Sequence, residues 1–115
     1  MPFVKINTNV SLTKGDKIKL VHAVKEIVPL ELKIDKKVVQ VILLDLDIGD
    51  ASKGQGEDFV WVEVTMYRGR SLQIKQGLAL AIIAEIKKYM NLDPKDINLV
   101  YYEVDKENFF SGQPD

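Results

Sequence analysis

The sequence contains no cysteine and a single histidine, His22, among its 115 residues. The absence of cysteine excludes disulfide bonds, a thiolate nucleophile, CxxC redox chemistry and cysteine-ligated zinc. With one histidine per chain, a metal site built from several histidines would need ligands from more than one chain. We therefore expect no metal site and no thiol redox chemistry. His22 falls in the first expected helix, where we interpret it as a surface or half-buried packing residue without a catalytic role.

An excess of charge of one sign is also lacking. The chain has 16 Lys and Arg residues and 17 Asp and Glu residues, so its formal net charge is −1. Nucleic-acid-binding domains usually carry a strong basic excess, and we expect no nucleic-acid partner. No apolar run approaches the ~18–20 residues of a membrane span, and the first residues lack the apolar core of a signal peptide. The sequence thus predicts a cytoplasmic protein without a membrane partner.

The spacing of apolar residues predicts strand, helix and strand, twice in succession. The expected strands are residues 3–7, 38–46, 59–66 and 97–104. The first expected helix is capped by Thr13 and closes, or has its last turn, at Pro29. The second is capped by Ser71 and continues to about Met90. Because single cores usually span ~100–150 residues, residues 1–115 should form one domain.

This order of elements is an internal repeat of two βαβ units, residues 3–47 and 59–105, joined by a glycine-rich connecting loop over residues 48–58. Two such units predict an α/β (α+β) fold, a four-stranded mixed sheet with both helices on one face. Residues 38–46 are apolar on both sides, which is typical of a strand covered on both faces. The helices cover one face, so we expect oligomerisation through the other.

Two motifs resemble those of known enzymes. Met1-Pro2 directly precedes the first strand, and residues 6–10, Ile-Asn-Thr-Asn-Val, resemble the opening of the macrophage migration inhibitory factor family. Residues 69–71, Gly-Arg-Ser, resemble the turn and helix start of 4-oxalocrotonate tautomerase. With Arg68 added, the turn resembles the paired arginines of malonate semialdehyde decarboxylase.

The second half adds further similarity. Residues 93–96 and 100–103 resemble the fourth-strand region of the inhibitory factor family, and the tail 107–112 resembles the ending of decarboxylase-like relatives. From these motifs, their order and the repeat, the chain is identified as a member of the tautomerase superfamily. The resemblance implies a homotrimer whose sheets line a central barrel, and cofactor-free chemistry on a small carboxylate substrate.

The superfamily's shared catalytic group is an N-terminal proline, and the resemblance gives that role to Pro2. Removal of Met1 would leave Pro2 with a free secondary amine. An α-amino group titrates near pH ~8 and a low-dielectric pocket lowers that value. The neutral amine could then act as a general base. If Met1 is retained, the nitrogen of Pro2 is an amide and cannot do so.

Three cations complete the expected site. Arg68 and Arg70 follow the third strand, whose end should lie near the start of the first strand. A guanidinium fork binds a carboxylate through two parallel bonds, so both arginines are candidate catalytic residues that hold the substrate. Lys33 falls where the inhibitory factor family has its substrate-binding lysine.

Several positions depart from the relatives. Asn98 and Val100 replace a pocket tyrosine and asparagine of the inhibitory factor family, and Lys37 occupies the acidic position of the decarboxylases. Phe109 and Phe110 stand in a polar tail, where they either cap the pocket or pack on a neighbouring subunit. These departures leave the exact reaction open.

The expected function is proton transfer, keto–enol or 1,3-tautomerisation, in a small 2-oxo carboxylic acid. Decarboxylation of a 3-oxo acid is the nearest enzymatic alternative, because the same arginines would stabilise an enolate-like charge. A non-catalytic trimeric binding or signalling protein, and a reconstructed scaffold without a native substrate, are the remaining alternatives.

Overall fold

The computed structural model describes residues 1–46 and 58–113. Its main elements are β1 (Phe3–Thr8), α1 (Lys14–Leu32), β2 (Gln40–Asp45), β3 (Val60–Tyr67), α2 (Leu72–Ile86) and β4 (Ile97–Val104). Short 3-10 turns stand at η1 (Lys36–Val38), η3 (Pro94–Asp96) and η4 (Lys106–Asn108). The connecting loop predicted over residues 48–58 lies, apart from Asp58, outside the described residues.

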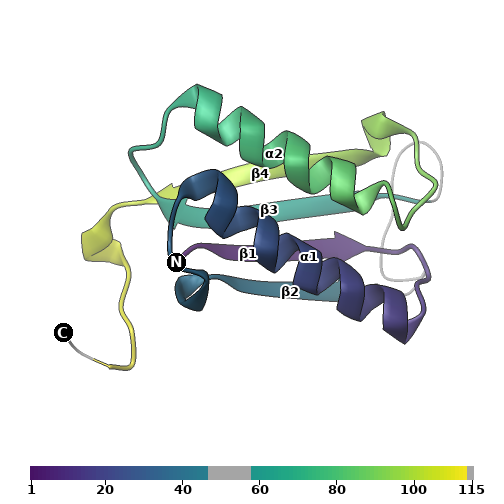
Figure 1. Ribbon diagram of the computed structural model, residues 1–115, viewed down its shortest axis with the longest axis horizontal. Coiled ribbons are helices and arrows are strands. Elements are labelled where there is room, and N and C mark those ends of the chain that lie inside the picture. The colour runs from purple at the N-terminus through teal and green to yellow at the C-terminus, as the bar shows by residue number, and fades with distance from the viewer. Residues whose placement is uncertain (47–57, 114–115) are drawn as a thin grey trace.

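The strands form a four-stranded sheet in the order β2-β1-β3-β4. Each half is a βαβ unit with a parallel pair, β1 with β2 and β3 with β4, and the two central strands run antiparallel. Both helices lie on one face of the sheet (Figure 1). The predicted α/β fold, a mixed sheet with two helices on one side, is confirmed.

The core lies between the helices and the sheet, and alternation along the central strands explains its composition. In β1 and β3 every second side chain is buried against the helices. The helices supply residues spaced four apart, so that each presents one apolar stripe. The fully buried members are Val4, Ile6, Leu20, Val24, Val28, Val62, Val64, Met66, Leu78, Ile82 and Ile86.

The helix boundaries follow local chemistry. The side chain of Thr13 accepts a hydrogen bond of 3.1 Å from the Asp16 N–H, as the capping pattern predicts. Helix α1 continues three residues past Pro29, because a proline in the last turn removes a single donor. Helix α2 ends at Ile86, earlier than the predicted Met90, where bonds to the third preceding carbonyl tighten the chain.

Strand β2 differs most from its prediction. It starts at Gln40 because residues 36–38 form a 3-10 turn capped by the Asp35 carboxylate. On the sheet face away from the helices, Ile42 is 38% exposed and Leu44 is 40% exposed. The expectation that this strand is covered on both sides is therefore not met within a single chain.

Several chain segments meet at one end of the sheet. The N-terminus, the end of α1, the turn between β3 and α2, and the tail after β4 all lie there (Figure 1). Among the described residues, neither helix combines the length and apolarity that crossing a membrane requires.

Candidate active site

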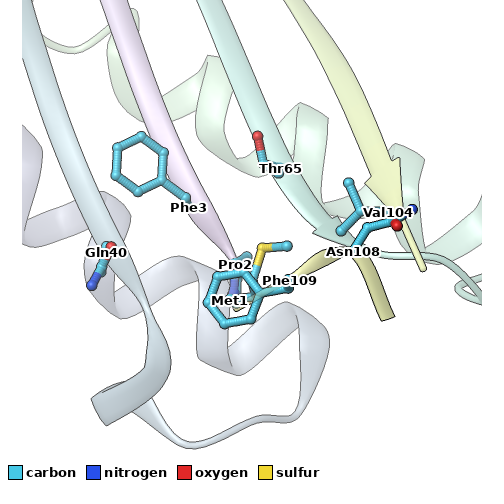
Figure 2. Close-up of a pocket in the computed structure, with 8 residues that line it drawn as sticks. All are labelled: Met1, Pro2, Phe3, Gln40, Thr65, Val104, Asn108 and Phe109. Carbon is cyan, nitrogen blue, oxygen red and sulfur yellow. The ribbon is translucent and has the colours of Figure 1, made fainter. Parts of the chain in front are cut away.

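A cavity of about 360 Å³ lies at the end of the sheet where β1 begins. Strand register builds it, because Phe3 of β1 pairs with Gln40 of β2 on one side and with Thr65 of β3 on the other. The tail after β4 supplies a further wall (Figure 2). The lining residues are Met1, Pro2, Phe3, Gln40, Thr65, Val104, Asn108 and Phe109.

The chemistry of this cavity is apolar with a few neutral polar groups. Phe3, Val104 and Phe109 provide apolar walls. Gln40 and Asn108 each provide an amide group, and Thr65 provides a hydroxyl group. None of the side chains that line the cavity in the described part of the chain is charged. The cavity is therefore lined by neutral side chains.

Pro2 is buried at the start of β1 and lines the cavity. Its carbonyl accepts a hydrogen bond of 3.1 Å from the Gln40 N–H, which ties the beginning of β1 to that of β2. While Met1 is attached, the Pro2 nitrogen is part of a peptide bond and carries no proton.

The two arginines lie in the turn after β3. Gly69 between them has φ +122°, a conformation that side-chain-bearing residues rarely adopt, so glycine permits this turn. Arg68 donates from Nε to the Asp105 carboxylate over 3.1 Å and from Nη2 to the Glu103 carbonyl over 3.4 Å. Its guanidinium group is thus occupied by the tail.

Arg70 is half-buried and its Nη1 donates a hydrogen bond of 3.4 Å to the Tyr67 carbonyl. Ser71 then caps α2, its hydroxyl accepting a hydrogen bond of 3.2 Å from the Ile74 N–H. Because β1 and β3 are antiparallel, this turn lies at the same end of the sheet as Pro2, yet neither Arg68 nor Arg70 lines the cavity.

Lys33 terminates α1. Its φ of 55° is left-handed, and its N–H donates to the carbonyl of Pro29, which closes the last turn. The side chain is exposed at the same end of the molecule as Pro2, outside the set of cavity-lining residues.

Sequence reasoning did not find the neutral polar lining, Gln40, Thr65 and Asn108. The first two are recognisable once strand register is known, because each is a direct neighbour of Phe3. The two phenylalanines of the tail have different surroundings: Phe109 lines the cavity, whereas Phe110 is 86% exposed. In residues 1–46 and 58–113, no group of three His, Cys, Asp or Glu side chains is placed to hold a metal ion.

Solved structures with the same architecture cover almost the whole chain. Pt0534 inactivated by 2-oxo-3-pentynoate is 18% identical with a TM-score of 0.88, covering 96% of this chain and 91% of its own. A fused 4-OT symmetric trimer is 21% identical with a TM-score of 0.86, covering 96% and 91%. FG41 malonate semialdehyde decarboxylase inhibited by 3-bromopropiolate is 18% identical with a TM-score of 0.80, covering 98% and 91%. At these identities the likeness shows the fold.

Sequence comparison gives the family. No curated protein sequence matches the chain. The sequence model described as tautomerase enzyme matches residues 48–111, which is more than half of the 115 residues and includes the arginine turn, α2, β4 and the tail. The chain therefore belongs to the tautomerase enzyme family.

Proposed function

We propose that this protein is a cofactor-independent tautomerase that moves a proton within a small 2-oxo carboxylic acid. The observation that carries the proposal is the position of Pro2, buried in the wall of an apolar cavity to which the chain brings its own terminus. Removal of Met1 would leave the secondary amine of Pro2 at that place.

The surroundings suit an amine that acts as a base. An α-amino group titrates near pH ~8 in water. The apolar walls, which include Phe3 and Phe109, suit a neutral amine better than its cation. The amine takes a proton from one carbon or oxygen of the substrate and returns it at another.

Arg70 is the better placed of the two guanidinium groups to bind the substrate carboxylate. It belongs to no ion pair within the described ranges, and it lies at the same end of the sheet as Pro2. Arg68, the other expected catalytic arginine, already binds Asp105, and the exposed Lys33 would add a helper cation. Support for a 2-oxo acid comes from Pt0534, which 2-oxo-3-pentynoate inactivates.

Decarboxylation of a 3-oxo acid is the second candidate. It is favoured by the likeness to a malonate semialdehyde decarboxylase, and both reactions pass through an enolate-like charge that a cation stabilises. Lys37 stands where those enzymes have an acidic residue and is exposed in the 3-10 turn η1, which weakens this candidate.

The functional unit we propose is a homotrimer of single-domain chains, each with one site. The open sheet face carries exposed Ile42, Leu44 and Trp61, an apolar surface that a neighbouring chain would cover. The fused 4-OT structure is a symmetric trimer, which supports the same arrangement here. The two halves, residues 3–47 and 59–105, would act as one domain.

Intact mass and kinetics test the proposal. The purified protein should lack Met1, and it should ketonise phenylenolpyruvate or 2-hydroxymuconate. Pro2→Ala, which after removal of Met1 leaves a primary amine in place of the secondary amine, should lower kcat/KM by about 10-fold or more, part of the about 100-fold or more that a general base contributes. Pro94→Ala, a proline substitution at the 3-10 turn before β4, is the matched control and should match wild type.

The alternatives give different results. Turnover of a 3-oxo acid in place of enols would support the decarboxylase. Equal rates for wild type and Pro2→Ala, or an active protein that retains Met1, would remove Pro2 from the mechanism. A folded trimer inactive on both substrate classes would indicate a binding protein.

A further inference from the structure

The segment that follows β4 completes the cavity. After Val104 the chain forms the turn η4, and Asn108 and Phe109 then contribute to the cavity wall (Figure 2). Phe109 is 41% exposed, so burial in a core does not fix its position. Some other contact must hold this wall in place.

Tyr67, the last residue of β3, contacts the segment through its ring. The rings of Tyr67 and Phe109 meet edge to face, with centroids 6.0 Å apart and planes at 87°. The Lys106 Nζ lies 5.8 Å from the centre of the same Tyr67 ring. One aromatic side chain thus touches both ends of the η4 turn.

Arg68, the next residue, binds the end of β4 and the first residue of the segment. Its main-chain N–H donates a hydrogen bond of 2.9 Å to the Val104 carbonyl. Its side chain donates to the Asp105 carboxylate over 3.1 Å and to the Glu103 carbonyl over 3.4 Å. Tyr67 and Arg68, which we call the clasp, therefore contact residues 103–109 at both ends.

We infer that the clasp residues are positioning residues: Tyr67 and Arg68 hold the tail so that Phe109 forms the wall of the Pro2 cavity, and they thereby set substrate affinity. This inference rests on the proposed function for its kinetic part. Arg68 acts through Asp105 and not by binding the substrate carboxylate. The Arg68 and Asp105 side chains are 63% and 53% exposed, and an ion pair that exposed contributes little stability. The contacts of the Tyr67 ring therefore contribute more than this ion pair to holding the tail in place.

Hydrogen exchange tests the clasp without any substrate. In Tyr67→Leu, the amides of Asn108 and Phe109, which bond to Asp105 and Lys106, should exchange about fivefold faster than in wild type. Tyr67→Phe keeps the edge-to-face contact and should exchange like wild type. Tyr102→Leu, a half-exposed tyrosine of β4 on the open sheet face, is the matched control. Equal exchange in Tyr67→Leu and Tyr102→Leu would overturn the inference.

Steady-state kinetics tests the effect on the site. Tyr67→Leu should raise KM about fivefold and change kcat less than about twofold, because it loosens a wall and leaves the proton-transfer groups intact. Tyr67→Phe should restore KM. An unchanged KM in a folded Tyr67→Leu, or a loss confined to kcat, would contradict the positioning role. A wild type without activity would defeat the proposed function and leave the exchange test decisive for the clasp.

A double-mutant cycle decides between the two roles of Arg68. If Arg68 acts through Asp105, Arg68→Gln and Asp105→Asn should raise KM by similar factors, and the double variant should be no worse than either one. If Arg68 bound the substrate carboxylate, Arg68→Gln would raise KM strongly while Asp105→Asn would leave it unchanged or lower it. That second pattern would refute the positioning role.

Discussion

The Tyr101 hydroxyl on β4 donates a hydrogen bond of 2.6 Å to the main-chain carbonyl of Lys75 on α2. The Lys75 ammonium in turn pairs with the Glu103 carboxylate over 2.9 Å, and both side chains are largely buried. These contacts join the second helix to the strand that leads into the tail. The orientation of α2 on the sheet therefore depends on polar contacts as well as on the apolar core.

Tyr101 should make the free energy of unfolding vary with pH in the alkaline range. Burial raises the pKa of its hydroxyl from the usual 10.0 to about 12. Between these values the folded state binds more protons than the unfolded state, so the free energy of unfolding falls as the pH rises from about 10 to about 12, and is unaffected by this group below about pH 10. Urea unfolding across this range should show a steeper loss for wild type than for Tyr101→Phe.

Tyr102→Phe is the control for Tyr101→Phe. At neutral pH Tyr101→Phe should cost about 1 kcal/mol, the net worth of one hydrogen bond. Tyr102→Phe, at a half-exposed neighbour, should follow the wild-type pH curve. Parallel curves for wild type and Tyr101→Phe would show that this hydroxyl does not titrate differently in the folded state.

Thr8 should be the threonine most sensitive to loss of its hydroxyl. It is fully buried, donates a hydrogen bond of 2.8 Å to the Phe59 carbonyl and accepts one of 3.0 Å from the Val10 N–H. Thr8→Val leaves both main-chain groups unpaired and should lower the free energy of unfolding by about 2 kcal/mol. Thr65→Val, in the half-buried lining of the cavity, should change it by less than about 0.5 kcal/mol in the same urea titration.

Lys33→Gly should stabilise the protein. Lys33 occupies a left-handed conformation at the end of α1, which costs a residue with a Cβ about 1 kcal/mol and costs glycine little. The unfolding midpoint should rise correspondingly. Lys19→Gly, an exposed position within α1, is the matched control and should lose about 1 kcal/mol. A destabilised Lys33→Gly would show that the lysine side chain makes a stronger contribution than its backbone costs.

Leu44→Glu should dissociate the proposed trimer. Leu44 lies on the open sheet face and is 40% exposed in the single chain, so a carboxylate there would be buried without a partner in an assembly. Leu80→Glu, on the outer surface of α2 and 67% exposed, should leave the assembly intact. Sedimentation velocity distinguishes the two, and a wild type that sediments as a monomer would reject the trimer itself.

Periodicity in the sequence was enough for the type and order of the elements. Strand β4 matches its predicted range of residues 97–104, and the Thr13 and Ser71 caps mark the two helix starts. Boundaries that depend on local competition were less accurate: α2 ends at Ile86 and not near Met90, and a 3-10 turn replaces the predicted first residues of β2. Both reflect hydrogen bonds that apolar spacing does not encode.

The candidate site was only partly accessible to sequence reasoning. The motifs direct attention to Pro2 and to the turn containing Arg68 and Arg70, and the predicted pairing of the central strands brings these to one end of the sheet. The motifs could not reveal that Arg68 is engaged by Asp105, because these residues are far apart in the chain. Neutral lining residues carry no motif at all.

The sequence by itself determined the two βαβ units and their mixed sheet, because alternating and helical periodicities and capping residues act locally. Motifs that resemble those of relatives indicated the end of the sheet at which the candidate site lies. Only the tertiary structure decided which side chains share the cavity and which arginine is already occupied. Register places Gln40, Phe3 and Thr65 in one row, and the clasp places Phe109 beside them. Such contacts arise when distant segments pack, and their geometry depends on the whole fold.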